Sequence, residues 1–199
     1  MKATQIARIV MLTLAVASAS CGSAVRGGTG TSFLIIDNLV AASGAEPDTF
    51  VGVLHSDVVT VVDDHPTIFS DSGRVTFRLG LKDPGPSGSP NQPTQNQAIT
   101  VDRYHVRFIR ADGRNTPGVD VPYGFDGAFT ATVSADTTVT FELVRHVAKA
   151  EAPLGALANN FTTISTIAEI TFYGRDLTGH EVSAVGRLTV DFGNFADPD

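Results

Sequence analysis

The chain has 199 residues, of which 42% are hydrophobic, 18% charged and 8% aromatic, so it is long enough for one ordinary domain or at most a small pair. Its 14 basic and 21 acidic side chains give a formal net charge of -7. This acidity excludes nucleic acid as a partner, because phosphate neutralisation needs clustered Lys and Arg. The apolar fraction excludes a disordered chain, and the sequence has no apolar run long enough to span a bilayer.

The first part of the chain, residues 1–21, has the composition of a secretory signal peptide. Lys2 and Arg8 precede an apolar run over residues 9–17, and small residues follow as far as Cys21. A positive start, a short apolar run and a small-residue end are typical of a cleaved leader rather than a transmembrane helix. The alternative is a buried N-terminal helix. We therefore expect an exported protein whose domain lies behind residue 21.

Cys21 is the only cysteine and lies at the expected cleavage point. Segment 18–21, Ser-Ala-Ser-Cys, resembles the lipobox of bacterial lipoproteins, in which such a Cys is lipidated and becomes the mature N-terminus. Position 18 is Ser, where that family usually has Leu or Val. The resemblance implies membrane contact through a lipid anchor only, and Gly22 implies delivery to the outer membrane. Alternatively, residues 17–19 form an ordinary cleavage site that would release a soluble periplasmic or secreted protein.

Behind the leader, residues 22–31 are small and polar, which predicts a flexible tether. From residue 32 onward apolar and polar residues alternate, which predicts strands and almost no helix. The expected strands cover residues 32–41, 49–55, 58–62, 74–81, 99–110, 128–134, 138–146, 167–175 and 181–192. Turn residues separate several of them: Asp71-Ser72-Gly73, Asp112-Gly113, Asp126-Gly127 and Thr178-Gly179. One short helix is expected over residues 152–158, with Pro153 in its first turn. Such strands joined by short connections predict an antiparallel β-sandwich over residues 32–199.

The last predicted hairpin shows the clearest alternation of faces. Ala168, Ile170 and Phe172 alternate with polar residues, and the returning strand continues the pattern through Leu188 and Val190. Residues 173–182, with an Asp-x-x-Gly turn, resemble the closing hairpin of bacterial immunoglobulin-like domains. That resemblance implies an immunoglobulin-like sandwich of about seven to nine strands. The chain departs from the family in having no Cys pair, no core Trp and no recognisable tyrosine corner.

Residues 83–97 have no apolar side chain apart from four prolines. Such a segment cannot bury enough surface to offset the entropy of ordering, so we expect a disordered surface loop within one sandwich. An interdomain linker is the alternative, but the strands before it are too few for a stable domain.

Several chemistries lack their motifs in this sequence. Outside the leader the chain has no Met, and its only Cys is the expected anchor, so a blue-copper site is excluded. His180-Glu181 lacks the second His of a zinc protease motif, and no nucleophile elbow or phosphate loop occurs. We expect neither a catalytic site nor a cofactor. Calcium at paired loop carboxylates is an alternative, and the candidate pairs are Asp63 with Asp64, Asp120 with Asp126, and Asp197 with Asp199.

Two predicted strands direct basic side chains away from the core. Arg74 and Arg78 alternate with Val75, Phe77 and Leu79, whereas Arg103, His105 and Arg107 alternate with Tyr104, Val106 and Phe108. If the two strands are neighbours, these cations form a strip that would bind an acidic protein or a polysaccharide. The alternative is cross-strand pairing with Glu142, Glu169 or nearby Asp residues, which solubilises a sheet face.

Residues 114–127 form a loop rich in Gly and Pro that contains two aromatic residues, Tyr123 and Phe125. These side chains are candidates for a binding loop. Alternatively, Val119, Val121 and Phe125 close the open end of the sandwich.

Together these features predict a non-enzymatic structural or interaction module of a bacterial cell envelope, with an envelope protein or polysaccharide as partner. The alternative is an exported carbohydrate-binding module or a hydrolase accessory domain. The sequence has no Trp and only three Tyr, which disfavours a sugar-stacking platform.

Overall fold

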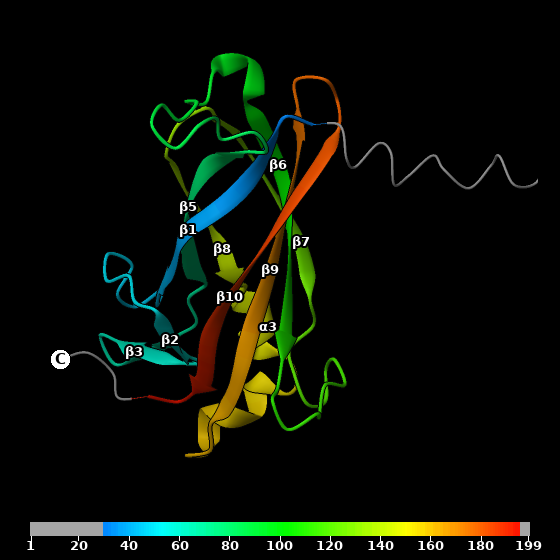
Figure 1. The fold of residues 1–199 in the computed structure, drawn as a ribbon. Coiled ribbons are helices and arrows are strands. Elements are labelled where there is room, and N and C mark those ends of the chain that lie inside the picture. Colours follow the sequence, from blue (N-terminus) through cyan, green and yellow to red (C-terminus); the bar gives the residue numbers. More distant parts are fainter. Residues whose placement is uncertain (1–29, 196–199) are drawn as a thin grey trace, which may run out of the picture.

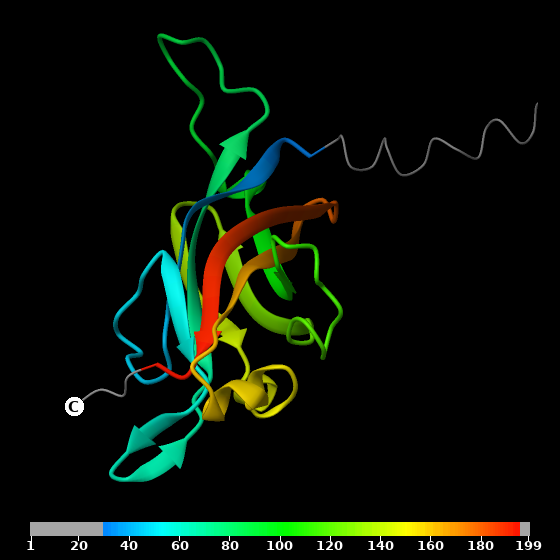
Figure 2. The same ribbon diagram turned by 90° about the horizontal axis from the view of Figure 1, so that it is seen from below.

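The computed structural model describes residues 30–195 and folds them into two packed β-sheets and a small hairpin (Figures 1 and 2). The three-stranded sheet has the order β1 (Ser32–Ala42), β5 (Asp71–Leu81), β8 (Thr137–Val144). The five-stranded sheet is strongly curled and has the order β2 (Val53–Asp57), β10 (Glu181–Gly193), β9 (Ile164–Asp176), β6 (Ile99–Ile109), β7 (Phe125–Val133). The predicted signal peptide, Cys21 and nearly all of the tether lie outside the described residues.

The core between the sheets is built from the inward-facing residues that the alternation predicts. Phe77 of β5 and Phe172 of β9 are fully buried, and their rings meet edge to face at 5.0 Å. Tyr104 of β6 packs against Phe141 of β8, and its hydroxyl donates to the backbone carbonyl of Glu142 at 3.0 Å. This hydrogen bond joins the two sheets and satisfies a polar group that burial would otherwise leave without a partner.

The prediction of a purely antiparallel sandwich is wrong in one pairing. Strand β2 runs parallel to β10, with Val53 opposite Thr189 and Asp57 opposite Gly193. The other pairings of the two sheets are antiparallel. After Ala42 the chain leaves the three-stranded sheet through residues 43–52 and adds β2 to the edge of the other sheet. The hairpin of β3 (Thr60–Val62) and β4 (His65–Thr67) then projects from the body, and β4 was not predicted.

Two of the four predicted turns lie inside strands instead. Asp71-Ser72-Gly73 begins β5, and Asp126-Gly127 lies near the start of β7. A Cβ at Gly73 would lie 2.4 Å from the Phe141 ring, and one at Gly127 would lie 2.2 Å from the Tyr104 ring. These glycines are therefore sites where an aromatic ring packs directly on the backbone, rather than turn residues. Turns do occur at Gly113 and Gly179, where φ is +83° and +84°.

The predicted helix over residues 152–158 is present as a 3-10 helix, and an α-helix that was not predicted precedes it. The α-helix α3 (His146–Ala150) comes earlier, where a strand was expected to end, and residues 154–159 form the 3-10 helix η2 (Leu154–Asn159). Lys149 of α3 is fully buried and its Nζ lies 2.8 Å from Asp71 Oδ1, so that an ion pair joins the helix to the first residue of β5. The local sequence favours a helix only weakly here, and this tertiary contact stabilises α3 in spite of that.

The predicted loop over residues 83–97 is a long excursion between β5 and β6 (Figure 2). Local hydrogen bonds shape it: Asn91 N donates to the Pro84 carbonyl at 2.8 Å, and the 3-10 helix η1 (Gln95–Gln97) ends it. Residues 86–96 are nevertheless continuously exposed. Its expected disorder stays a prediction.

Candidate functional site

The predicted strip of basic residues does not form, because its two strands lie in different sheets. Arg74 and Arg78 project from β5, whose neighbours are β1 and β8, whereas Arg103 and Arg107 project from β6, between β9 and β7. Arg78 Nε donates to Asp37 at 2.8 Å, and the Arg74 guanidinium lies 3.6 Å from the centroid of the Phe50 ring. Alternation in each strand correctly predicted which side chains face outward, but it contains no information on which strands pair.

The outer face of the five-stranded sheet carries a ladder of ion pairs. Glu169 of β9 accepts from Arg107 of β6 at 2.6 Å and from Arg187 of β10 at 2.7 Å. These two hydrogen-bonded arginines hold the pKa of Glu169 below its usual range. His105 Nδ1 lies 2.9 Å from Asp126 Oδ1. For Arg107, the cross-strand alternative with Glu169 is therefore confirmed.

Further along the same face, a β-bulge in β6 changes which of its side chains point outward. The register of β6 against both β7 and β9 shifts between Val101 and Arg103. The residues on either side, Val101 and Tyr104, are buried, and both Asp102 and Arg103 are exposed. A regular strand would direct consecutive side chains to opposite faces, so the bulge is what places this acid and this base together on the outer face.

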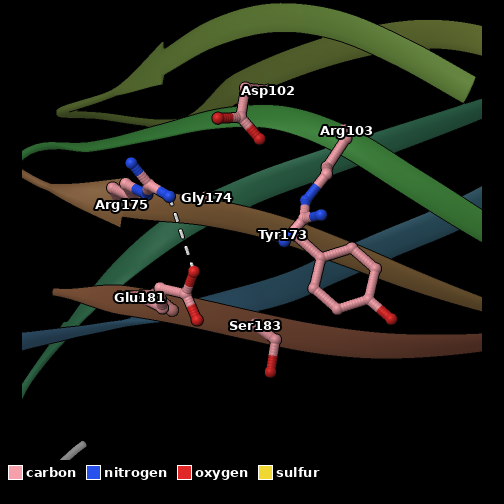
Figure 3. A pocket seen from close by; sticks show the side chains of 8 residues that line it. Asp102, Arg103, Tyr173, Gly174, Arg175, Glu181 and Ser183 are labelled. Carbon is pink, nitrogen blue, oxygen red and sulfur yellow. Dashed lines mark ion pairs between the residues drawn. The ribbon is translucent and has the colours of Figure 1, made fainter. Parts of the chain in front are cut away.

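Beside the bulge lies a shallow depression of about 180 Å³, lined mainly by Asp102, Arg103, Tyr173, Arg175, Glu181 and Ser183 (Figure 3). We call it the bulge pocket. The Arg103 guanidinium lies over the Tyr173 ring, 4.8 Å from its centroid. Across the pocket, Arg175 Nη2 and Glu181 Oε1 are 3.5 Å apart. Its polar groups come from β6, β9 and β10, so the pocket depends on correct pairing of three strands.

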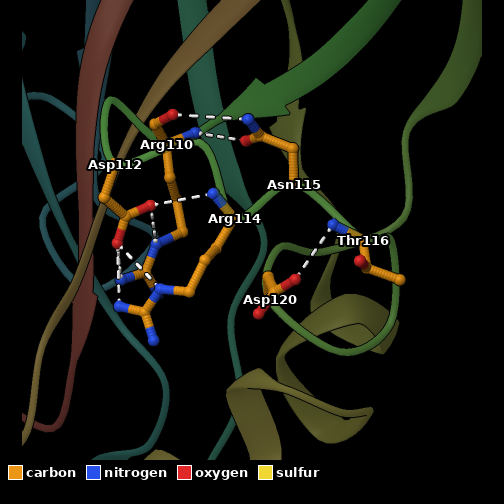
Figure 4. A network of polar contacts seen from close by, with 6 residues as sticks. All are labelled: Arg110, Asp112, Arg114, Asn115, Thr116 and Asp120. Carbon is orange, nitrogen blue, oxygen red and sulfur yellow. Dashed lines mark hydrogen bonds and ion pairs between the residues drawn. The ribbon is translucent and has the colours of Figure 1, made fainter.

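The β6–β7 loop is held by a polar network (Figure 4). Asp112 accepts from Arg110 at 2.7 Å and from Arg114 at 2.8 Å, and these hydrogen bonds hold its pKa far below the usual range. Asn115 Oδ1 accepts from Arg110 N at 2.6 Å, and Asp120 Oδ2 accepts from Thr116 N at 3.1 Å. The loop therefore presents its remaining side chains from a defined backbone.

The two aromatic candidates of this loop have different environments. Phe125 is buried as the first residue of β7 and packs edge to face with Tyr104, as the end-closing alternative expected. Val121 is buried with it. Tyr123 is 52% exposed and Val119 is 67% exposed, so these two remain available on the surface.

Exposed apolar side chains are distributed unevenly between the two ends of the sandwich. The chain enters at the end where Ser32 pairs with Leu81, close to the β9–β10 turn; we call this the entry end (Figure 1). At the opposite, or far, end lie the β6–β7 loop, α3, η2 and the β3–β4 hairpin. Exposed large apolar side chains there are Val119, Tyr123, Val147, Phe161, Val61 and Val62. Near the entry end the corresponding side chains are Phe33, Leu177 and Val185.

Residues 30–195 contain neither a cluster of metal-ligating side chains nor a membrane-spanning helix. This part of the chain contains no group of three or more His, Cys, Asp or Glu side chains that could hold a metal ion. No helix within it is long and apolar enough to cross a membrane. Of the candidate calcium pairs, Asp63 and Asp64 form the β3–β4 turn, and Asp120 and Asp126 are hydrogen-bonded within the protein. Asp197 and Asp199 lie outside the described residues.

No protein-family model, curated protein or solved structure matches this chain.

Sequence reasoning missed the bulge pocket, although a signal for it exists. Inward positions are odd-numbered up to Val101 and even-numbered from Tyr104 onward, with two charged residues between them. Such a change of phase within one strand indicates a bulge. The buried pair of Asp71 and Lys149 was missed for a different reason, since the two residues are 78 positions apart and nothing local relates them.

Proposed function

We propose that this protein is a non-enzymatic interaction module of the bacterial cell envelope, exported by its leader and tethered through Cys21. We further propose that its fold is a variant of the immunoglobulin-like sandwich. The order β1-β5-β8 corresponds to strands A, B and E of that fold, and β10-β9-β6-β7 corresponds to G, F, C and C′. Many unrelated functions use this architecture, so the surface side chains, and not the fold, indicate the function.

The observation that carries the proposal is the distribution of exposed apolar side chains between the two ends. A tether before residue 30 would hold the entry end towards the membrane, and the far end would then face away from it. Exposed aromatic and aliphatic side chains on a rigid support are what protein interfaces use as anchors. Tyr123 and Val119 fit this description, because the Asp112 network holds their loop.

Site-specific photocrosslinking in the envelope tests this proposal. A photoreactive residue at Tyr123 should give discrete crosslinked products with envelope proteins, because the far end contacts the partner. The matched control is Leu177, which is 62% exposed but lies in the turn at the entry end. Equal products from both positions, or none from Tyr123, would overturn the proposal.

A second arm of the experiment tests the tether. In Cys21→Ala, fatty-acid labelling and membrane retention should both be lost, while the domain stays folded. A wild-type protein that is unlabelled and soluble, beginning at Ser20, would refute the anchor but would leave the far-end interface open to the crosslinking test.

The carbohydrate-binding alternative has less support on the sheet face. A sugar would need an open aromatic face, and the Tyr173 ring of the bulge pocket is covered by the Arg103 guanidinium.

A further inference from the structure

The bulge pocket presents two charges that no other part of the described chain neutralises. Neither Asp102 nor Arg103 has an ion-pair partner among residues 30–195, although both project into the same depression. Elsewhere on this face the pattern is different, because Arg107 and Arg187 are both bound to Glu169. The pocket is therefore the place where the charge pairing of the sheet face is incomplete.

The Arg103 guanidinium is held in an orientation that suits a planar anion. Its guanidinium lies over the Tyr173 ring, which covers one side of the cation and restricts its rotation. The N–H groups at the edge of the guanidinium stay available, and they match the two oxygens of a carboxylate. Less conformational entropy is lost on binding when the cation is already positioned.

The other side of the pocket has the opposite charge. Figure 3 shows Arg175 between Asp102 and Glu181, and Arg103 beside the Tyr173 ring. One base and two acids leave this side with one net negative charge. The contact of Arg175 with Glu181 is long, at 3.5 Å, and its side chains are 62% and 73% exposed, so a competing cation can displace it at low cost.

We propose that the bulge pocket binds a small zwitterion of amino-acid type. The ligand's carboxylate is bound by Arg103, and its ammonium group displaces Arg175 from Glu181 and faces Asp102 and Glu181. The pocket holds two arginines and two carboxylates, so neither a simple anion nor a simple cation complements all of it, and a ligand with both charges is the better complement. This inference is independent of the proposed far-end interface, because the pocket lies nearer the entry end.

The test is a titration of the full chain, labelled uniformly with nitrogen-15, with L-alanine and two analogues. N-acetyl-L-alanine lacks the ammonium, and L-alanine methyl ester lacks the carboxylate. The Arg103 Nε–H resonance should shift saturably with L-alanine, and each analogue should bind at least about tenfold more weakly. Arg103→Gln should abolish binding, which is then followed through the Ser183 amide.

Arg187→Gln is the matched control, since it removes an arginine from the same face but outside the pocket. It should leave the L-alanine titration unchanged. The proposal is overturned if L-alanine gives no saturable shift, if an analogue binds as well as the zwitterion, or if Arg187→Gln weakens binding as much as Arg103→Gln does. None of these outcomes affects the crosslinking test of the far end.

Discussion

At the scale of single residues, the ion pair of Asp71 and Lys149 is the feature of the fold with the largest cost of burying charge. The two side chains are 0% and 1% exposed, and Asp71 also accepts from Ser56 Oγ at 2.6 Å and from Gly44 N at 2.9 Å. Burial raises the pKa of Asp71, while the Lys149 ammonium and the Ser56 and Gly44 donors oppose that rise. A fully hydrogen-bonded pair is tolerated in a core, whereas a single buried charge is not.

Removing one partner should therefore cost far more than an average substitution. Asp71→Ala leaves the Lys149 ammonium buried without a counter-charge, and we expect the free energy of unfolding to fall by about 3–5 kcal/mol in urea titrations. The double variant Asp71→Ala with Lys149→Met should recover part of that loss, because no charge is left unpaired. A loss below about 1 kcal/mol in the single variant would show that water reaches the pair.

Glu169 gives the fold a predictable dependence on pH. Its pKa is lowered from 4.5 by hydrogen bonds from Arg187 and Arg107, so the folded state binds its proton less tightly than the unfolded chain does. The resulting stabilisation is complete above pH 4.5 and is lost as the pH falls through the lower, folded-state pKa.

Glu169→Gln should thus be less stable than the wild type by up to ~1 kcal/mol near neutral pH. This difference should disappear in urea titrations carried out well below pH 4.5. Glu181→Gln is a suitable comparison, because Glu181 has a single, longer ion pair and should show little difference at either pH. A Glu169→Gln penalty that persists in acid would assign the effect to packing instead of charge.

At the scale of elements, the sequence predicted the strands whose alternation is long and uninterrupted. The β9–β10 hairpin is confirmed, with Ala168, Ile170 and Phe172 all fully buried and a turn from Asp176 to Gly179. The predictions of turns and helix from the sequence were wrong where a distant contact decides the local structure. Gly73 and Gly127 have the composition of turns but lie under aromatic rings, and α3 forms where Lys149 reaches Asp71.

The parallel pairing of β2 with β10 can be tested by a disulfide. Val53 and Thr189 are opposite each other and both exposed, and neighbouring strands lie about 5 Å apart, which is within disulfide reach. With Cys21 replaced by Ser, the pair Val53→Cys and Thr189→Cys should oxidise readily and shift the band on a non-reducing gel. The pair Val53→Cys and Glu181→Cys should not, since Glu181 is about 25 Å further along β10. Equal crosslinking of both pairs would contradict the parallel register.

At the scale of the whole molecule, the assignment of strands to sheets could not be predicted from local pattern. Strands β5 and β6 follow each other in the sequence, but the excursion over residues 83–97 carries the chain from one sheet to the other. The predicted strip of basic residues required β5 and β6 to be neighbours in one sheet. They lie in different sheets, so the strip does not form. What the sequence did predict, for each strand separately, was the side that faces the core.

The same crossover leads to a prediction about proteolysis. Residues 86–96 are continuously exposed, so limited digestion with a broad-specificity protease should cut there first. The two fragments should stay together in size-exclusion chromatography, because the β5–β8 and β2–β10 pairings both join chain from before the cut to chain from after it. Fragments that separate under native conditions, or a first cut inside the β6–β7 loop, would contradict this arrangement.

The β2–β10 pairing also determines when the domain can be completed. Asp57 accepts a hydrogen bond from Phe195 N across 138 positions, so the edge strand β2 is held by residues far along the chain. Contacts of such long sequence separation give a high contact order, for which folding takes milliseconds to seconds rather than microseconds. A nascent chain that still lacks β10 has an open β9 edge and an unpaired β2. The domain can thus acquire its native strand order only after β10, the last strand of the described residues, is available to pair with β2 and β9.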